Sequence, residues 1–213
     1  MMFDPQQRKE NRSARIMMAL FRMSQAIKKV TQAESDEQGL SPVQIQALLF
    51  TLYTRSDVAS VGNFAKAIGT THVTAVKIIN GLVIKGHMTK VPKKEDRRVT
   101  LLQLTAKGEE AAASLEKWGH TLEEALHSIP DEILEDFEIG LGSVITAMQR
   151  RGHLVVAEPC LGCIHFRPNT GDSHTPHYCA FMEKYLTHEA SLKECPEHLS
   201  SGNLNNDRQY LSE

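Results

Sequence analysis

The sequence predicts a mainly α-helical protein that contains one small β-hairpin and ends in a short cysteine-rich module. Apolar residues recur at helical spacing over much of the chain, two short strand-like segments flank a charged turn, and all four cysteines follow residue 159. The 213 residues suit one ordinary domain with a small appendage. We expect residues 1–153 to form the main domain, and residues 154–213 to form the module with a loose C-terminal tail.

Composition narrows the class of protein. Hydrophobic residues make up 41% of the chain and charged residues 23%, as in ordinary globular proteins. The chain has no apolar run long enough to cross a membrane, and its polar start is unlike a secretory signal. We therefore expect a cytoplasmic protein with no membrane partner. In that reducing compartment, cysteines bind metals or react as thiols more often than they form disulfides.

The first long helix is predicted over residues 8–31, where apolar positions alternate by steps of four and three. These positions are Ile16, Leu20, Met23, Ile27 and Val30. Such spacing is typical of a helix that packs against another helix. Ser41 and Pro42 predict the start of a helix over residues 42–53, because serine caps free N–H groups and proline suits the first helical position.

Residues 61–86 predict two helices separated by a turn at Gly69, Thr70 and Thr71. Glycine ends the first helix, and a threonine caps the second. The apolar face of the second helix consists of Ala75, Ile78, Ile79 and Leu82. Gly81 lies in that helix, where glycine costs about 1 kcal/mol relative to alanine. Close approach of another backbone is one explanation for it.

A β-hairpin is predicted next, with strands over residues 88–92 and 99–104 and a charged turn between them. Thr105 then caps a helix that continues to about residue 128, and another helix covers residues 130–151. From residue 61 to residue 108 there are nine lysines and arginines but only two acidic residues, whereas the chain after residue 154 is acidic on balance. This asymmetry predicts a local nucleic-acid surface and a separate module.

Helix, turn, helix and basic hairpin, in that order, describe a winged helix-turn-helix. The chain here resembles the MarR family of bacterial regulators. The resemblance rests on LVIKG at 82–86, DRR at 96–98, LQLTAKG at 102–108 and SPVQIQALLF at 41–50, and it covers roughly residues 10–150. It implies a dimeric architecture with interleaved first and last long helices, and a homodimer that binds a pseudopalindromic operator in double-stranded DNA as a transcriptional regulator, expected to be a repressor.

Candidate DNA-binding residues follow from this architecture. Helix N-termini favour anions, so Thr70 and Thr71 are expected at a phosphate. Outward polar side chains of the second helix are expected at base edges or phosphates: His72, Thr74, Lys77 and Asn80. The wing charges are expected to contribute affinity more than sequence choice: Lys90, Lys93, Lys94, Arg97 and Arg98. The resemblance implies that Asp96 orients the wing and that Arg98 enters the minor groove.

The four cysteines predict a metal centre. Cys160 and Cys163 form a CxxC turn, and fifteen residues separate Cys163 from Cys179 and Cys179 from Cys195. Structural zinc commonly uses two close pairs, and this segment has only one. The single later cysteines, with a proline directly after Cys195, look like the cysteine ligand sets of 4Fe-4S iron-sulfur proteins. Zinc is the alternative, and a metal-free thiol switch or inert cysteines are a third.

Other residues of this segment have expected roles. A histidine could replace one cysteine as a ligand, and His177 and His198 are the first to test. The five histidines are His165, His174, His177, His188 and His198. Phe166 and Phe181 are expected to form the small core around the centre. A cluster there could sense redox state, nitric oxide or iron and alter the spacing of the two recognition helices.

An enzyme and a protein that does not bind DNA are the other two classes of function to consider. An enzyme is disfavoured because the chain has no phosphate loop, no GxSxG, no HExxH and no dinucleotide fingerprint. The remaining alternative is a winged helix that serves only as a protein scaffold or redox protein, or one that carries a purely structural zinc site. The basic wing disfavours a scaffold. A small-molecule effector could also bind, and the sequence does not identify one.

Overall fold

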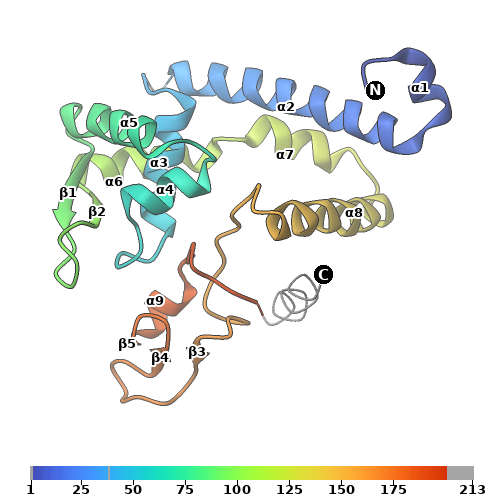
Figure 1. Cartoon of the computed structure of the whole chain (residues 1–213). Helices are drawn as coiled ribbons and strands as arrows, with labels where there is room; N and C mark the ends of the chain where they lie inside the picture. The colour runs from blue at the N-terminus through green and yellow to red at the C-terminus, as the bar shows by residue number, and fades with distance from the viewer. Residues whose placement is uncertain (1, 38, 201–213) are drawn as a thin grey trace.

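The computed structural model describes residues 2–37 and 39–200 (Figure 1). The helices are α1 (Pro5–Glu10), α2 (Arg12–Glu37), α3 (Pro42–Tyr53), α4 (Val61–Ala67), α5 (His72–Ile84), α6 (Ala106–Ala113), α7 (His120–His127), α8 (Asp131–Arg150) and α9 (His188–Leu192), with a 3-10 turn over Ser114–Lys117. The strands are β1 (Met88–Pro92), β2 (Thr100–Leu104), β3 (Phe166–Arg167), β4 (His177–Cys179) and β5 (Lys184–Leu186). The wing β1–β2 lies at the left of Figure 1, α8 lies on the opposite side, and the C-terminal module lies below.

Two predicted helices are interrupted. The helix expected over residues 8–31 is two helices, because Asn11 adopts an extended conformation and its side chain accepts a hydrogen bond from the Ala14 N–H at 3.2 Å. The helix expected from residue 106 to residue 128 is also interrupted, because α6 ends at Ala113, a 3-10 turn follows, and α7 starts only after Gly119, which has a left-handed φ of 90°. Glu34 of α2 accepts bonds from the Gly119 N–H at 2.8 Å and from the Thr121 hydroxyl at 3.0 Å. A tertiary partner therefore replaces the helical bonding there.

Predicted caps and faces account for the helix-turn-helix. Ser41 and Gln44 form a capping box at the start of α3, and the Thr71 side chain accepts from the Thr74 N–H at the start of α5. The core between α3, α4 and α5 contains fully buried side chains, which include Ile45, Leu48, Phe64, Ile79 and Leu82. At Gly81 a Cβ atom would lie 2.8 Å from the Gln44 side-chain nitrogen, so a side chain rather than another backbone occupies that space.

The wing is a two-stranded antiparallel hairpin in which Met88 pairs with Leu104 and Pro92 pairs with Thr100. The second strand begins at Thr100, one residue later than predicted. Thr105 joins the wing to α6, because its hydroxyl donates to the Gly86 carbonyl at 2.6 Å and accepts from the Gly108 N–H at 3.1 Å. Met88 and Leu102 are buried, and this fixes the wing on the core.

The C-terminal module is a small three-stranded antiparallel sheet in the order β3-β4-β5, followed by α9. Its core contains Cys160, Cys179 and Leu186, with Phe166 packed against them. Phe181 was expected in this core, but its side chain is 52% exposed. The expected loose tail, SGNLNND at residues 201–207, lies outside the described residues.

The module docks on the segment between α3 and α4. The Arg55 N–H donates to the Glu194 carbonyl, and the Glu194 N–H donates to the Tyr53 carbonyl, both at 2.9 Å. Lys184 forms an ion pair with Asp57 at 2.9 Å. The cysteine-rich module is therefore bonded directly to the residues that lead into the helix-turn-helix.

Within the described residues, no single helix is long and apolar enough to cross a membrane. The helices α4 and α5, which are bent by 112° relative to each other, together have the length and composition of a broken membrane span, and nothing else in the described chain points to one.

Candidate nucleic-acid interface and cysteine centre

Helix α5 presents a polar outer surface. His72, Thr74 and Lys77 are exposed, and so is the capping Thr71, whereas Thr70 in the preceding turn is half-buried. The opposite face holds Ala75, Ile79 and Leu82 in the core. The predicted division of α5 into a buried face and a polar face is therefore present, and the first turn of the helix is open to an anion.

The wing reaches back to α5. The Lys90 ammonium of β1 donates to the Asn80 side-chain oxygen at 2.8 Å, which leaves Asn80 half-buried and already partnered. A groove of about 270 Å³ between helix and wing is lined by residues from both, including His72, Lys90 and Arg98. The helix and the wing thus form one continuous surface with a cationic edge.

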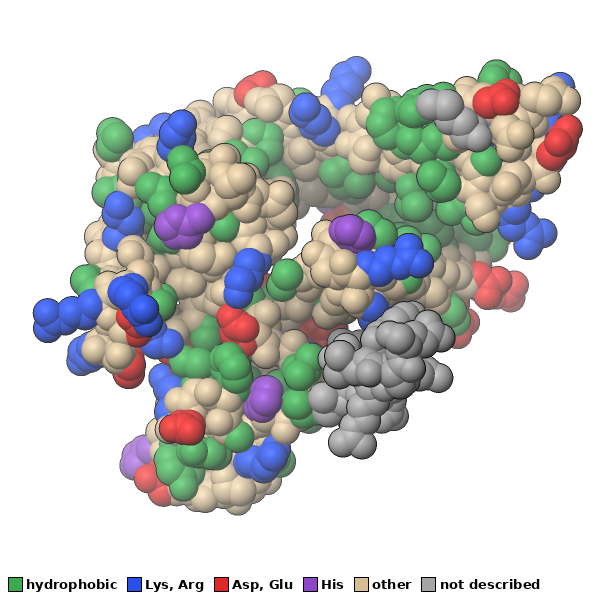
Figure 2. Space-filling model, in the orientation of Figure 1, with side chains coloured by type: hydrophobic (Ala, Val, Ile, Leu, Met, Phe, Trp, Pro, Cys, Tyr) green, Lys and Arg blue, Asp and Glu red, His purple; other side chains and the backbone are tan. Residues whose placement is uncertain are grey.

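The wing tip is organised around Asp96. Its carboxylate accepts from the Arg98 backbone N–H and from the Arg98 Nε and Nη2, all at 3.0 Å. The side-chain and backbone bonds from Arg98 hold the pKa of Asp96 below its ordinary value. The Arg98 side chain is still 91% exposed, and Lys94 and Arg97 are exposed, while Lys93 is half-buried. Figure 2 shows Lys and Arg side chains gathered at the wing.

The long helices carry apolar side chains that nothing in the described chain covers. On α2, Ile16 is 49% exposed and Met23 is 50% exposed. On α8, Phe137, Ile139 and several neighbours are likewise exposed, and no residue of α8 is buried. Contiguous apolar surface of this kind is unusual on a monomer and marks an interaction surface.

The CxxC turn has a local explanation. The Cys163 N–H donates to the Cys160 carbonyl at 3.1 Å, and Gly162 has a φ of 86°. Such a turn requires a positive φ at its third residue, which glycine adopts without strain. Leu161 points into solvent. The turn therefore brings Cys160 and Cys163 toward the same side.

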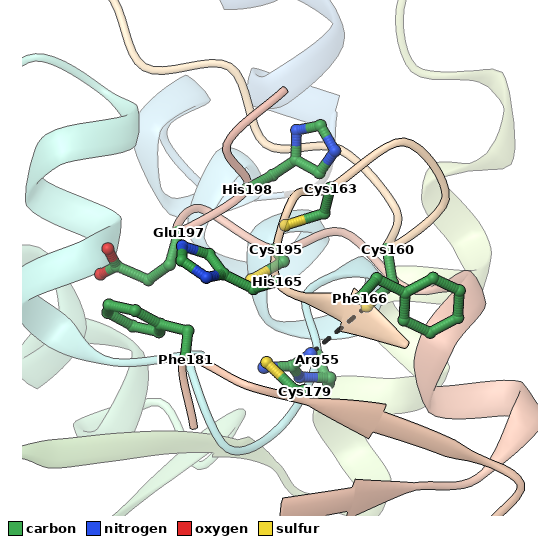
Figure 3. Close-up of a pocket in the computed structure, with 10 residues that line it drawn as sticks. All are labelled: Arg55, Cys160, Cys163, His165, Phe166, Cys179, Phe181, Cys195, Glu197 and His198. Carbon is green, nitrogen blue, oxygen red and sulfur yellow. Dashed lines mark hydrogen bonds between the residues drawn. The ribbon is translucent and has the colours of Figure 1, made fainter. Parts of the chain in front are cut away.

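All four cysteines line one cavity (Figure 3). Cys160, Cys179 and Cys195 are buried and Cys163 is half-buried. The cavity has a volume of about 10 Å³, room for about one water molecule. Burial raises the pKa of the Cys195 thiol to about 11 and also raises the pKa of the Cys160 thiol. Burial therefore favours the neutral form of the Cys160 and Cys195 thiols.

Arg55 also lines this cavity, although no sequence pattern pointed to it. It is 2% exposed, its Nη1 donates to the Cys160 sulfur at 3.4 Å, and its Nε donates to Asp57 at 2.7 Å. Burial would lower the pKa of Arg55, but the Asp57 carboxylate raises it above its ordinary value, so the guanidinium stays charged. One signal was available: an Arg-x-Asp sequence in the short connection between two core helices.

Two of the five histidines line the cysteine cavity, and the other three lie outside its lining. His198 and His165 line the cysteine cavity, and the buried His198 Nε2 has no hydrogen-bond partner. His177 instead bonds to His188 at 3.2 Å and contacts the ring of Phe166, outside the cavity lining. His174 is exposed. Among the described residues, no group of three or more His, Cys, Asp or Glu side chains is arranged to hold a metal ion.

Comparison with solved structures identifies the fold of the chain. No protein-family model matches the chain, and no curated protein matches it. The MepR–DNA complex of S. aureus is similar in structure, at 20% identity and a TM-score of 0.56, over 61% of this chain and 96% of that one. CouR from Rhodococcus jostii RHA1, bound to p-coumaroyl-CoA, matches at 17% identity and a TM-score of 0.54, over 61% of this chain and 90% of that one. A transcriptional regulator (MarR family) from Rhodococcus sp. RHA1 matches at 16% identity and a TM-score of 0.54, over 63% of this chain and 94% of that one. The chain thus has the winged-helix fold of these regulators, which the sequence predicted.

Proposed function

We propose that the chain is a transcriptional regulator that binds double-stranded DNA as a homodimer. The observation that carries this proposal is the surface formed by α5 and the wing, where an exposed polar helix face adjoins Lys90 and Arg98. Helix α5 enters the major groove, and the wing contacts the backbone or the adjacent minor groove. The MepR structure, which has the same fold, is a DNA complex.

The uncovered apolar faces of α2 and α8 support the homodimer. Ile16, Met23 and Phe137 are each about half exposed in the single chain, and a second copy that covers them would remove this apolar surface from water. Two copies present two α5 helices, so the operator is pseudopalindromic, and binding there represses transcription. A small-molecule effector belongs to the same proposal, since the CouR structure contains p-coumaroyl-CoA.

The cysteines hold a metal centre in this proposal, with Cys160, Cys163, Cys179 and Cys195 as ligands. We propose a 4Fe-4S cluster rather than zinc because the segment has only one close cysteine pair, followed by single cysteines and by a proline after Cys195. Zinc bound by the same four thiolates is the alternative.

Two polar groups at the cavity also suit an anionic centre. The Arg55 Nη2 and the His198 Nε2 are buried, have no hydrogen-bond partner and belong to residues that line the cavity. Donors of this kind bond to the sulfurs of thiolate-ligated metals and tune them. When bound, a cluster supplies one-electron redox chemistry and reactivity toward oxidants and nitric oxide, and the protein senses these signals or iron supply.

Anaerobic purification with a visible spectrum and analysis of iron, sulfide and zinc tests the centre. We expect a brown protein with four irons and four sulfides per chain, a stoichiometry that follows from the cluster type. Cys179→Ser should abolish it, and Leu161→Ser, in the exposed part of the CxxC turn, should not. Zinc without iron would contradict the cluster, and equal DNA affinity of loaded protein and Cys179→Ser would make the centre structural only.

A further inference from the structure

Arg55 occupies a position that the proposed DNA surface does not explain. It lies in the connection between α3 and α4, more than 100 positions before the cysteine to which it donates. Its guanidinium is buried, and each nitrogen has a distinct environment. Nε donates to Asp57, Nη1 donates to the Cys160 sulfur, and Nη2 is buried at the cavity without a partner.

The charges around Arg55 do not cancel. Asp57 is shared between two cations, because it pairs with Arg55 at 2.7 Å and with Lys184 at 2.9 Å. Glu197, which also lines the cavity, pairs with Lys66 at 3.6 Å. The group of Arg55, Asp57 and Lys184 therefore has two positive charges and one negative charge, and the Lys184 side chain is 45% exposed to water. The buried Arg55 Nη2 still has no acceptor, which is costly, and the sulfurs of a metal centre would supply one.

The backbone at Arg55 is also the junction between the two parts of the chain. Its N–H donates to Glu194, the residue before Cys195, and the Glu194 N–H returns to Tyr53 at the end of α3. The side chain of Arg55 thus faces the cysteines while its backbone holds the residue next to one of them. One residue therefore connects the cavity with the docking contact of the module.

We infer that Arg55 is the positioning residue through which an anionic metal centre fixes the cysteine module on the α3–α4 connection. This inference rests on the proposed metal centre and adds the route by which the centre affects the DNA-binding helices. When the thiolates hold a metal, the guanidinium is fully paired and the module is docked. When the metal is lost, the buried Arg55 Nη2 is left without an acceptor at the cavity and the module loosens.

Amide hydrogen exchange of Arg55 and Glu194 tests the inference, because both amides bond across the junction. The variants are Arg55→Met, Arg55→Lys and, as the matched control, Lys66→Met, which removes an exposed cation that also contacts the module. Each full-length protein is stripped of metal and reloaded anaerobically with ferrous iron, ferric iron and sulfide, or separately with zinc. Metal content per chain is measured alongside exchange.

For the wild type and Lys66→Met we expect loading to slow exchange at both amides, on the order of tenfold. In Arg55→Met the slowing should be absent although metal is bound, and Arg55→Lys, which keeps the charge, should restore part of it. If Arg55→Met instead binds no metal, binding of metal by Arg55→Lys supports the role of the charge. If both Arg55 variants bind no metal while Lys66→Met does, the role of the charge is contradicted. Equal slowing in Arg55→Met and wild type overturns the inference. A wild-type chain that takes up neither iron nor zinc contradicts the proposed centre itself.

Discussion

Replacing Arg98 with alanine tests whether the wing tip contacts the phosphate backbone. Arg98 is 91% exposed, so its ion pair with Asp96 contributes little to folding and the melting temperature should not change. Each phosphate contact contributes a slope of about 0.9 to the dependence of log affinity on log salt. Loss of one contact should therefore shift the ratio of wild-type to variant affinity by roughly 3.5-fold between about 50 and 200 mM salt. Fluorescence anisotropy with a labelled duplex measures both slopes.

Asp96→Ala separates charge from geometry at the same site. Removal of a carboxylate makes the wing more positive, so an effect of charge alone would tighten binding. The side chain and backbone of Arg98 are instead held by Asp96 at 3.0 Å, and loss of this positioning should weaken binding while the salt slope stays at its wild-type value. Tighter binding by Asp96→Ala, or an unchanged slope in Arg98→Ala, would refute the placement of Arg98 on DNA.

Three further predictions concern stability and assembly. Gly108→Ala places a Cβ atom 1.9 Å from the His87 carbonyl oxygen and should lower the free energy of unfolding by about 1–3 kcal/mol or more in urea titrations. Gly62→Ala, where the Cβ atom would meet only one atom at 3.9 Å, should leave the free energy of unfolding unchanged or raise it. Equal effects of the two substitutions would contradict the close approach at Gly108. Phe137→Glu puts a charge on the uncovered face of α8 and should convert the dimer to a monomer in analytical sedimentation, whereas Phe137→Leu should leave the dimer intact. If the Phe137→Glu protein is still a dimer, the interface lies elsewhere. Burial would raise the pKa of Asp57, but Arg55 and Lys184 hold it below its ordinary value. The melting advantage of wild type over Asp57→Asn should therefore be present at pH 7 and disappear as the pH falls below about 4, the ordinary carboxyl value; an advantage that persists at pH 2 would contradict these ion pairs.

Local signals account for the parts of the fold that the sequence predicted. Ser41, Thr71 and Thr105 each cap a helix as their residue types indicate, and the alternation in β2 places Leu102 in the core. The bounds of α3 agree with the prediction at both ends, and those of α8 agree within one residue. These elements are specified by residues within one or two turns of each boundary, so a sequence pattern is sufficient to locate them.

The break at Asn11 is local, but two other features that were missed depend on residues distant in sequence. Gly119 ends a helical pattern because Glu34, 85 positions earlier, bonds to its N–H. The pairing of Arg55 with Cys160 spans 105 positions and gives no periodic signal. The CxxC turn and the later cysteines could be grouped by residue type alone, but the guanidinium at their cavity could not. Tertiary contacts of this kind are visible only once the chain is folded.

In the proposed function, α5 and the wing deliver positive charge to duplex DNA. The most direct measurement is equilibrium binding of the purified, metal-loaded chain to duplexes that flank its own gene, across a series of salt concentrations. We expect a site bound by two chains with an affinity that falls steeply as salt rises, because wing lysines and arginines displace counterions. Binding that is absent at every salt concentration, or that does not respond to salt, would contradict the account.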